Sequence, residues 1–505
     1  MPLRLLVAVL SGSVLSILAP PANIHLLHWI AYLPMFWALR EGETRNNAVL
    51  SLCYGTVAVA LIFRWLVDTI TVFSNIPFLG AVGVLLLFGI VFGLPYSAIW
   101  LAVHPLRRRL GHWWVLAIPA WLVVVEWVSA YVLLFPYQQG VTQYRVPLTS
   151  QLSSVTGIWG LSFLVMWFNA MLAEGMYRLQ EGREWPWGHS AGAMAGLAAT
   201  LVFGAIRHER VEAVLRDAPQ MRIAQLQSDR GMEWRMEHSA RAAFREWMDA
   251  TQALEPGSAD LVVWPEGACP YDLNTGRAAD WLAEEAKRGG YEMIVGGGTR
   301  ERERDPELDV DEVRTFNSTY FFTPQGEVGG RYDKMVPLPF GEYLPFAETF
   351  PWLADIIEGP GSFRAGESAV VFAGDKARMA TPICYEAILG YVCRWYDRPE
   401  LLVNVTNDAW FGKTAASPLH GMLAAIRAVE LGVPLYRSAY TGTSFAAEPH
   451  GHIHSETELF DRVHRIVTVR LATFDTIYGR YGDWFVALCA AGLAASMAAS
   501  RRRSA

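Results

Sequence analysis

Residues 380–386 read ATPICYE, an apolar run that ends in the thiol of Cys384 and continues into an aromatic residue and an acid. Two charged residues upstream follow similar runs. Glu266 stands in LVVWPEGA, and Lys334 stands in RYDKMVPLPFGEYLP. Because each run combines apolar, β-branched or aromatic residues with turn residues after it, we read it as a strand. We expect the three side chains to meet in one catalytic site.

A nucleophilic role for Cys384 needs help from its neighbours. A thiol has an ordinary pKa of about 8.5, so only a few per cent is thiolate at neutral pH. Glu266, fixed at a strand end by Pro265, is suited to act as the general base. Lys334 would stabilise a thiolate or an oxyanion, with the backbone N–H of Tyr385 as a second donor. Taken singly, the three also fit an inert core thiol, a turn acid and a solvated lysine.

The composition of the sequence changes at about residue 210: charged residues become frequent, and β-rich runs alternate with helical patterns. The strand-like runs are 221–227, 259–266, 291–299, 317–334, 368–374, 377–386, 400–408, 433–440, 443–453 and 464–471. Helical runs with one apolar face are 236–254, 278–290 and 420–432. This alternation predicts a layered α/β domain over 210–475, with helices covering its sheets.

The remainder of the chain is apolar. The 505 residues are 52% hydrophobic and only 18% charged, which is typical of a membrane protein. A net charge of −7 argues against nucleic-acid binding. Segments of about 17–25 apolar residues can cross a bilayer, and we predict eight such spans. They are 3–19, 24–40, 48–67, 77–103, 114–135, 155–177, 189–206 and 484–500.

Arginine placement predicts the orientation of these spans. With eight spans, the arginines near the span ends fall on one side of the membrane, and Arg145 is the exception. Because arginine is enriched in cytoplasmic loops, this placement predicts that both termini are cytoplasmic. A cleaved signal peptide is the alternative for residues 1–19, although it leaves an odd number of spans. The predicted domains are 1–209 with seven membrane helices, 210–475 on the outer face, and 476–505 with the last helix and a basic tail. The aligned arginines are Arg4, Arg40, Arg45, Arg107, Arg108, Arg109, Arg178, Arg183, Arg501, Arg502 and Arg503.

The order WPE, DKMVPLPFGEYLP and CYE resembles the nitrilase superfamily of carbon–nitrogen hydrolases. VNVTNDAWFG at 403–412 and IRAVELGVPLYRSAYTG at 426–442 are similar to later strands and a helix of that superfamily. The resemblance implies an αββα sandwich with a catalytic triad of Glu266, Lys334 and Cys384. Tyr440 departs from the pattern, because such chains often have Asn there.

A nitrilase-like domain inserted between membrane spans resembles the bacterial apolipoprotein N-acyltransferases. That family moves an acyl chain from a phospholipid to the α-amine of a diacylglyceryl-cysteine at a lipoprotein N-terminus, without metal or cofactor. The resemblance implies an inner-membrane protein with a periplasmic catalytic domain. It also implies an acyl thioester on Cys384 and supporting roles for Glu342, Tyr385 and Glu386. A membrane setting suits this reaction, since extracting a 16-carbon chain would cost about 12 kcal/mol at roughly 0.8 kcal/mol per CH₂.

Other residues are weaker candidates. Residues 343–363 are apolar and irregular, and we expect either a lid that contacts lipid or ordinary packing. His450, His452 and His454 alternate along a predicted hairpin and fit exposed strand residues better than a metal site. Pairing of Cys269 with Cys393 stays open. The candidate lipid contacts, some of which fit core packing equally well, are Trp234, Phe350, Trp352, Ile356, Ile357, Trp410 and Phe411.

Two other functions stay open at this point. One is a membrane-tethered amidase or nitrile hydrolase that acts on small molecules, which leaves eight spans unexplained. The other is an inactive nitrilase-like scaffold that binds lipoproteins, against which stand the three triad residues in matching contexts.

Overall fold

The computed structural model describes residues 1–42, 44–74, 76–133, 135–305, 310–347, 349–352 and 362–504. The chain divides into two compact units. A helical unit contains Met1–Asp68, Ile76–Arg210 and Asp475–Ala505, and an α/β unit contains Thr69–Asn75 and Val211–Phe474.

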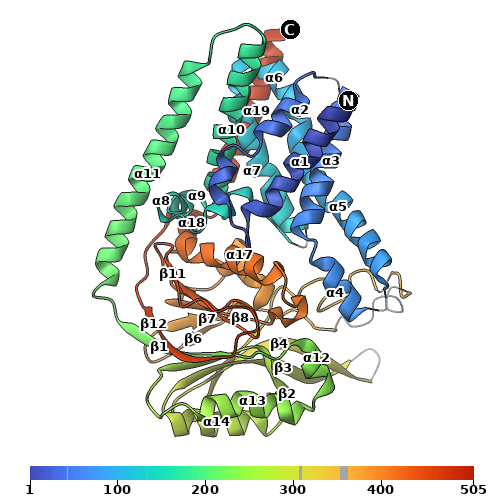
Figure 1. Ribbon diagram of the computed structural model, residues 1–505. Coiled ribbons are helices and arrows are strands. Elements are labelled where there is room, and N and C mark those ends of the chain that lie inside the picture. Colours follow the sequence, from blue (N-terminus) through green and yellow to red (C-terminus); the bar gives the residue numbers. More distant parts are fainter. Residues whose placement is uncertain are drawn as a thin grey trace. The chain divides into compact units, whose positions relative to one another are not determined.

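Apolar helices build the first unit (Figure 1). Five helical segments of the described chain are long and apolar enough to cross a membrane: Thr44–Ile62, Phe78–Val132, Ile158–Gln180, Trp187–Leu215 and Trp484–Arg501. The main helices are α1 (Pro2–Leu18), η1 (His25–Trp29), α2 (Leu33–Leu39), α3 (Thr44–Ile62), α4 (Leu66–Phe73), α5 (Phe78–Leu101), α6 (Val103–Leu110), α7 (Trp114–Val132), α10 (Ile158–Gln180), α11 (Trp187–Leu215), α18 (Ile477–Tyr481) and α19 (Trp484–Ser504). Shorter turns are η2 (Gly111–Trp113), η3 (Gln139–Gln143), α8 (Pro147–Ser150) and α9 (Ser153–Thr156).

The predicted span over 24–40 is broken into η1 and α2. Pro34 lies in the first turn of α2, where a helix does not need the N–H that proline lacks. At the break, the Asn169 side chain accepts from Tyr32 N at 3.1 Å and donates to His28 O at 3.0 Å. These bonds satisfy backbone groups that a continuous helix would have paired. Because α2 has seven residues, the prediction of eight spans is not confirmed.

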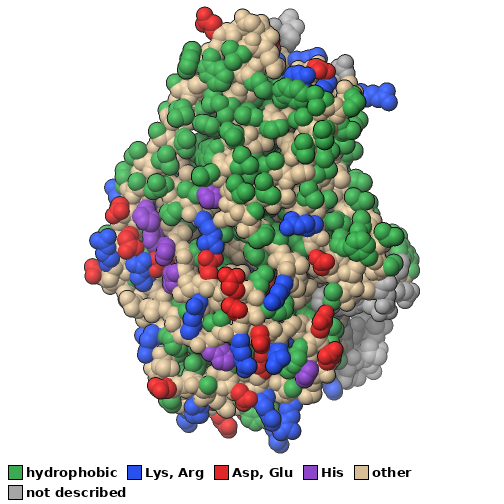
Figure 2. Space-filling view, in the orientation of Figure 1, with side chains coloured by type: hydrophobic (Ala, Val, Ile, Leu, Met, Phe, Trp, Pro, Cys, Tyr) green, Lys and Arg blue, Asp and Glu red, His purple; other side chains and the backbone are tan. Residues whose placement is uncertain are grey.

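Apolar side chains cover much of the helical unit on the face seen in Figure 2. Leu79, Trp187 and Val132 are 81%, 74% and 73% exposed. Soluble proteins rarely expose contiguous apolar area of this kind, whereas lipid accepts it. The helices and their surface are consistent with a membrane protein.

The α/β unit contains two six-stranded sheets, ordered β12-β1-β2-β3-β4-β5 and β11-β10-β9-β8-β7-β6. Each has parallel strands at its centre and antiparallel strands at its edges: β1, β2 and β3 run parallel in the first sheet, and β7, β8 and β9 in the second. The strands are β1 (Gln220–Gln227), β2 (Leu261–Asp272), β3 (Glu292–Asp305), β4 (Val310–Phe322), β5 (Val328–Asp333), β6 (Val371–Ala373), β7 (Arg378–Ala380), β8 (Leu401–Thr406), β9 (Leu435–Ala439), β10 (Phe445–Ala447), β11 (Ile453–His454) and β12 (Val463–Arg470).

The two sheets are layered, and helices cover both outer faces (Figure 1). β2 contacts β8 and β9 across the centre. α13 (Ala240–Gln252) and α14 (Ala278–Gly289) lie on the first sheet, and α17 (Ala416–Leu431) lies on the second. The predicted αββα sandwich is therefore confirmed. Short helices complete the unit: α12 (Met232–Glu237), η4 (Cys384–Ile388), α16 (Gly390–Cys393) and η5 (Asp408–Phe411).

α13 shows how sequence periodicity makes a core. Ser239 caps the helix by accepting from Ala242 N, and the apolar face carries Phe244 and Trp247 into the protein. The Trp247 ring packs against Trp264 of β2 with 6.1 Å between ring centroids. Burying a large apolar side chain stabilises the fold by about 1.5–3 kcal/mol.

The local predictions that differ from the structure include two strand ends and one histidine. The strand predicted over 377–386 ends at Ala380, and Cys384 instead begins η4. β2 continues beyond Glu266, although its pairing with β3 shifts register between Trp264 and Cys269. His450 is buried rather than exposed, because it faces two carboxylates.

Candidate active site

Cys384 occupies a strained turn between β7 and η4. Its φ is +51°, a left-handed conformation that costs a non-glycine residue roughly 1–3 kcal/mol. Ile383, one residue earlier, forms an isolated bridge with Val405 of β8. The backbone therefore turns sharply at the sulfur-bearing residue, which is 8% exposed.

The carboxylate of Glu386 ties this turn to the loop that carries Lys334. It accepts from Ile383 N at 2.8 Å, from Met335 N at 2.7 Å and from Val336 N at 3.1 Å. The Tyr332 hydroxyl donates to both of its oxygens at 2.8 Å. Burial raises the pKa of Glu386 to about 7, against the opposing effects of Lys334 and the donated bonds. Glu386 thus fixes Lys334 relative to Cys384.

Lys334 lies between two carboxylates. Its Nζ is 2.6 Å from Glu342 Oε2 and 3.6 Å from Glu266 Oε1. Its side chain is 1% exposed, and its backbone N donates to Asn317 O at 2.8 Å. Burial acts to lower the pKa of Lys334, but Glu342, Glu266 and Cys384 outweigh it, so the pKa rises. The ammonium is therefore permanent at neutral pH.

Asn317 bridges the two acids from β4. Its Nδ2 donates to Glu266 Oε1 at 2.7 Å and to Glu342 Oε1 at 2.5 Å. The outer oxygens accept from the backbone, since Asn407 N donates to Glu266 at 2.8 Å and Leu338 N donates to Glu342 at 2.6 Å. Each carboxylate is held by hydrogen bonds at both oxygens, so its orientation is fixed.

The charges decide the resting state of the sulfur. Burial and the Glu266 carboxylate raise the pKa of Cys384, while Lys334 acts in the opposite direction. The net shift is upward, so Cys384 is a thiol until a base removes its proton. Glu266 is suited to be that base, because it is buried, oriented and electrostatically coupled to the sulfur.

The structure brings together Glu266, Lys334, Glu342, Cys384 and Glu386, with Tyr385 directly after the sulfur. The sequence interpretation missed Asn317. Its signal was present, because Asn317 and Thr319 alternate on one face of β4, and Thr319 Oγ1 is 2.6 Å from Thr381 Oγ1 beside the second sheet. The interpretation also missed His420, which contacts the Cys384 carbonyl oxygen, and Asp408, which contacts His420.

The lipid-contact candidates lie mostly at the surface of the α/β unit. Phe350 and Trp352 are 46% and 55% exposed and contact each other edge to face. Trp410 is 43% exposed, and Phe411 is half-buried in the same short helix. Trp234 is half-buried and stacks on His238 at 4.2 Å. Ile356 and Ile357 fall outside the described residues.

Two cysteines outside the site are buried and do not form a disulfide bond with each other. Cys269 and Cys393 are separate free thiols, and burial raises the pKa of each to about 12.

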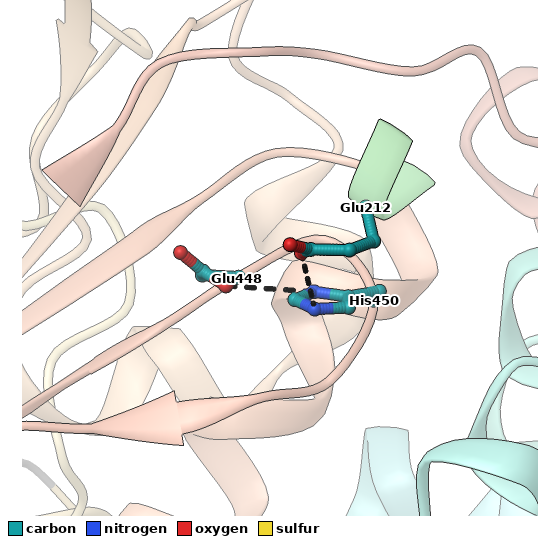
Figure 3. A group of neighbouring side chains, drawn as sticks. All are labelled: Glu212, Glu448 and His450. Carbon is teal, nitrogen blue, oxygen red and sulfur yellow. Dashed lines mark ion pairs between the residues drawn. The ribbon is translucent and has the colours of Figure 1, made fainter. Parts of the chain in front are cut away.

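Glu212, Glu448 and His450 form the one group in the described part of the chain whose ligand atoms could hold a metal (Figure 3). His450 Nε2 is 3.3 Å from Glu212, and its Nδ1 is 3.6 Å from Glu448. The Arg470 guanidinium donates to both carboxylates. These acids are therefore already paired with a cation of the protein, and the group is an ion-pair network that joins α11 to β12.

Two sequence profiles of known families match this chain, one in each unit. The sequence profile described as apolipoprotein N-acyltransferase N-terminal domain matches residues 11–171, and the carbon–nitrogen hydrolase profile matches residues 220–477. A crystallised CN-hydrolase superfamily protein from Xanthomonas campestris is 17% identical, with a TM-score of 0.36 over 55% of this chain and 97% of its own.

Similar sequences with the same name are found in other bacteria. The apolipoprotein N-acyltransferase of Geobacter metallireducens is 32% identical over 99% of this chain and 95% of its own length. That of Bradyrhizobium diazoefficiens is 33% identical over 82% of this chain and 79% of its own. The chain belongs to the apolipoprotein N-acyltransferase family, the acyltransferases of the carbon–nitrogen hydrolase superfamily.

Proposed function

We propose that this protein transfers an acyl chain from a phospholipid to the α-amino group of the N-terminal diacylglyceryl-cysteine of apolipoproteins. The observation that carries the mechanism is the buried Cys384 thiol beside a Lys334 ammonium that two oriented carboxylates hold in place. A site of this kind supplies a nucleophile, a base and a fixed positive charge without a metal or a cofactor.

In the first half-reaction, Glu266 takes the proton from Cys384 Sγ, and the thiolate attacks the ester carbonyl carbon of the phospholipid. Lys334 stabilises the oxyanion of the tetrahedral intermediate, with the backbone N–H of Tyr385 as the second donor. The C–O bond to the glycerol then breaks, and Glu266 returns its proton to the leaving alkoxide. A lysophospholipid departs, and the acyl group remains as a thioester on Cys384.

In the second half-reaction, the lipoprotein amine attacks the thioester. Only the neutral amine is a nucleophile, and because its ordinary pKa is about 8, the ammonium form first releases a proton to solvent. The attacking nitrogen then loses a further proton as the new C–N bond forms. Glu266 accepts that proton and passes it to the departing Cys384 sulfur. Water must be excluded in between, or the thioester hydrolyses.

We also propose the arrangement in the cell. Residues 1–209 and 476–505 are the membrane part, 210–475 is the periplasmic catalytic domain, and both termini are cytoplasmic in the bacterial inner membrane. Charge placement and the apolar helices support this arrangement. The exposed Phe350, Trp352 and Trp410 suit contact with acyl chains, because lipid removes apolar surface from water.

The deciding experiment follows the acyl group. The purified protein is incubated with phospholipid labelled in its acyl chain, and the label is traced after denaturation. We expect a hydroxylamine-sensitive label on Cys384, absent from Cys384→Ala and present in Cys393→Ala, a matched buried thiol of the same unit. Full acyl transfer by Cys384→Ala would end the proposal. Turnover of small soluble amides without lipid would indicate an amidase, and lipoprotein binding without any label would indicate a scaffold.

A further inference from the structure

A histidine and an acid lie next to the backbone of the nucleophile. His420 of α17 has Nε2 at 3.1 Å from the carbonyl oxygen of Cys384 and Nδ1 at 3.0 Å from Asp408 Oδ1. The His420 side chain is 10% exposed, and that of Asp408 is fully buried. His420 therefore connects the backbone of the nucleophile to an internal acid.

Asp408 is an ionised acceptor. Burial acts to raise the pKa of Asp408, but Arg437 and His420 outweigh it and hold the pKa below its usual range. Arg437 Nη2 donates to Oδ2 at 2.7 Å, and Ser417 Oγ donates to the same oxygen at 2.6 Å. Thr406 Oγ1 donates to Oδ1 at 3.0 Å. A carboxylate that receives these bonds has no proton to offer His420.

Both ring nitrogens of His420 thus face atoms that only accept. A carbonyl oxygen cannot donate, and neither can an ionised carboxylate. A neutral imidazole has one N–H, so either tautomer would point a lone pair at one of the two oxygens. Only the imidazolium donates to both.

We propose that His420 is a positioning residue, held as an imidazolium between Asp408 and the Cys384 carbonyl, that maintains the strained turn on which the sulfur sits. The proposal rests on the nucleophilic role of Cys384. Two side chains then hold the backbone around the nucleophile: Glu386 accepts from Ile383 N–H at 2.8 Å, one residue before Cys384, and His420 binds the Cys384 C=O. Because a φ of +51° is unfavourable for cysteine, releasing the carbonyl lets the turn relax and moves the sulfur away from Lys334.

The proton count can be measured on the unaltered protein. The chain is labelled with [¹⁵N]histidine and [1-¹³C]cysteine, and the His420 ring is identified by its dipolar coupling to the Cys384 carbonyl carbon. At a pH of about 8, where a free imidazole is neutral, we expect both His420 nitrogens to carry protons. A signal from either neutral tautomer at this ring, or the lack of any His–Cys coupling, would overturn the proposal.

The functional effect is measured as the rate of thioester formation in single turnovers. We expect His420→Ala and His420→Gln to lower the maximal rate roughly 10–100-fold, as for loss of a hydrogen bond to a charged group, with the apparent KM for phospholipid unchanged. His464→Gln, on the exposed face of β12, is the control and should keep the wild-type rate.

A folded His420→Ala protein with the wild-type rate would refute the positioning role. If that variant does not fold, the proton count on the unaltered protein decides the matter. Acyl transfer that survives in Cys384→Ala would instead refute the proposed function, so the two failures are distinguishable.

Discussion

Asn317→Asp tests the charge balance of the site most directly. The amide that donates to Glu266 at 2.7 Å and to Glu342 at 2.5 Å becomes a third carboxylate facing two others. At roughly 3 Å and an effective dielectric constant of about 20, each like-charge pair costs about 5 kcal/mol. The new acid avoids this by remaining protonated. Carrying a proton at pH 7 costs about 1.4 kcal/mol for each unit above an ordinary pKa of about 4, or about 4 kcal/mol.

The expected loss in the free energy of unfolding is the smaller of these values, about 4 kcal/mol at pH 7. The size of this loss depends on pH. The pKa of the new acid is raised in the folded state, so below about pH 4 it is protonated in both states and the penalty disappears. As pH rises, the penalty grows by about 1.4 kcal/mol per unit until the folded acid also ionises.

Thermal unfolding in detergent at several pH values between about 5 and 7 measures this slope against wild type. A loss of 4 kcal/mol lowers the midpoint by roughly 8–16 °C in a domain of this size. Asn317→Leu is the matched control, because it loses both donated bonds without adding a charge, so its penalty should not change with pH. If Asn317→Asp unfolds at the wild-type midpoint at pH 7, the two acids are not ionised beside this side chain.

Three further perturbations have defined outcomes. Lys334→Met leaves two buried carboxylates without their cation, so we expect no thioester and a loss of about 3–5 kcal/mol in thermal unfolding; wild-type stability would contradict the buried ion pairs. Glu386→Gln turns an acceptor into a donor against a buried N–H, and should cost about 1–3 kcal/mol and slow thioester formation; an unchanged rate would contradict the role of Glu386. Arg470→Met should destabilise the protein while sparing thioester formation, and EDTA should affect neither; a loss of activity with EDTA would restore a metal at Glu212 and Glu448.

The sequence predicted the sandwich because its strands and helices are locally consistent. The run around β8 is rich in β-branched residues, those around β1 and β9 contain apolar and aromatic residues, and 278–290 and 420–432 have one apolar face, so pattern and fold agree. The convergence of Glu266, Lys334 and Cys384 was also predictable, since Glu266 lies in β2, Lys334 directly follows β5, and Cys384 lies shortly after β7.

The turn at Cys384 was not predictable from pattern. ATPI continues the apolar character of β7, which favours a strand as far as the sulfur. In the structure, the Glu386 carboxylate takes the Ile383 N–H, which an extended strand would have donated to a neighbour. A side-chain hydrogen bond between residues three positions apart therefore ends the strand. Hydrophobic periodicity does not predict such a bond, because it depends on one polar side chain. The hydrogen bond that Tyr32 N donates to Asn169 at the broken span joins residues 137 positions apart, and the sequence pattern does not predict it either.

The charges around the sulfur explain why two acids, Glu266 and Glu342, flank one lysine. At rest, these acids contribute two negative charges and Lys334 one positive, so the net charge of the three side chains is −1 with a neutral thiol. Ionising Cys384 to solvent would make it −2 in a buried site, which is why the pKa of the thiol is raised. When Glu266 takes the proton, the net charge stays at −1, because a thiolate replaces a carboxylate. Glu342 is 2.6 Å from Lys334 and takes no part in the proposed proton transfer, so in the proposed mechanism the ammonium stays charged and in place when the oxyanion forms. A single acid would have to act as base and hold the lysine at once, and the second acid separates these two tasks.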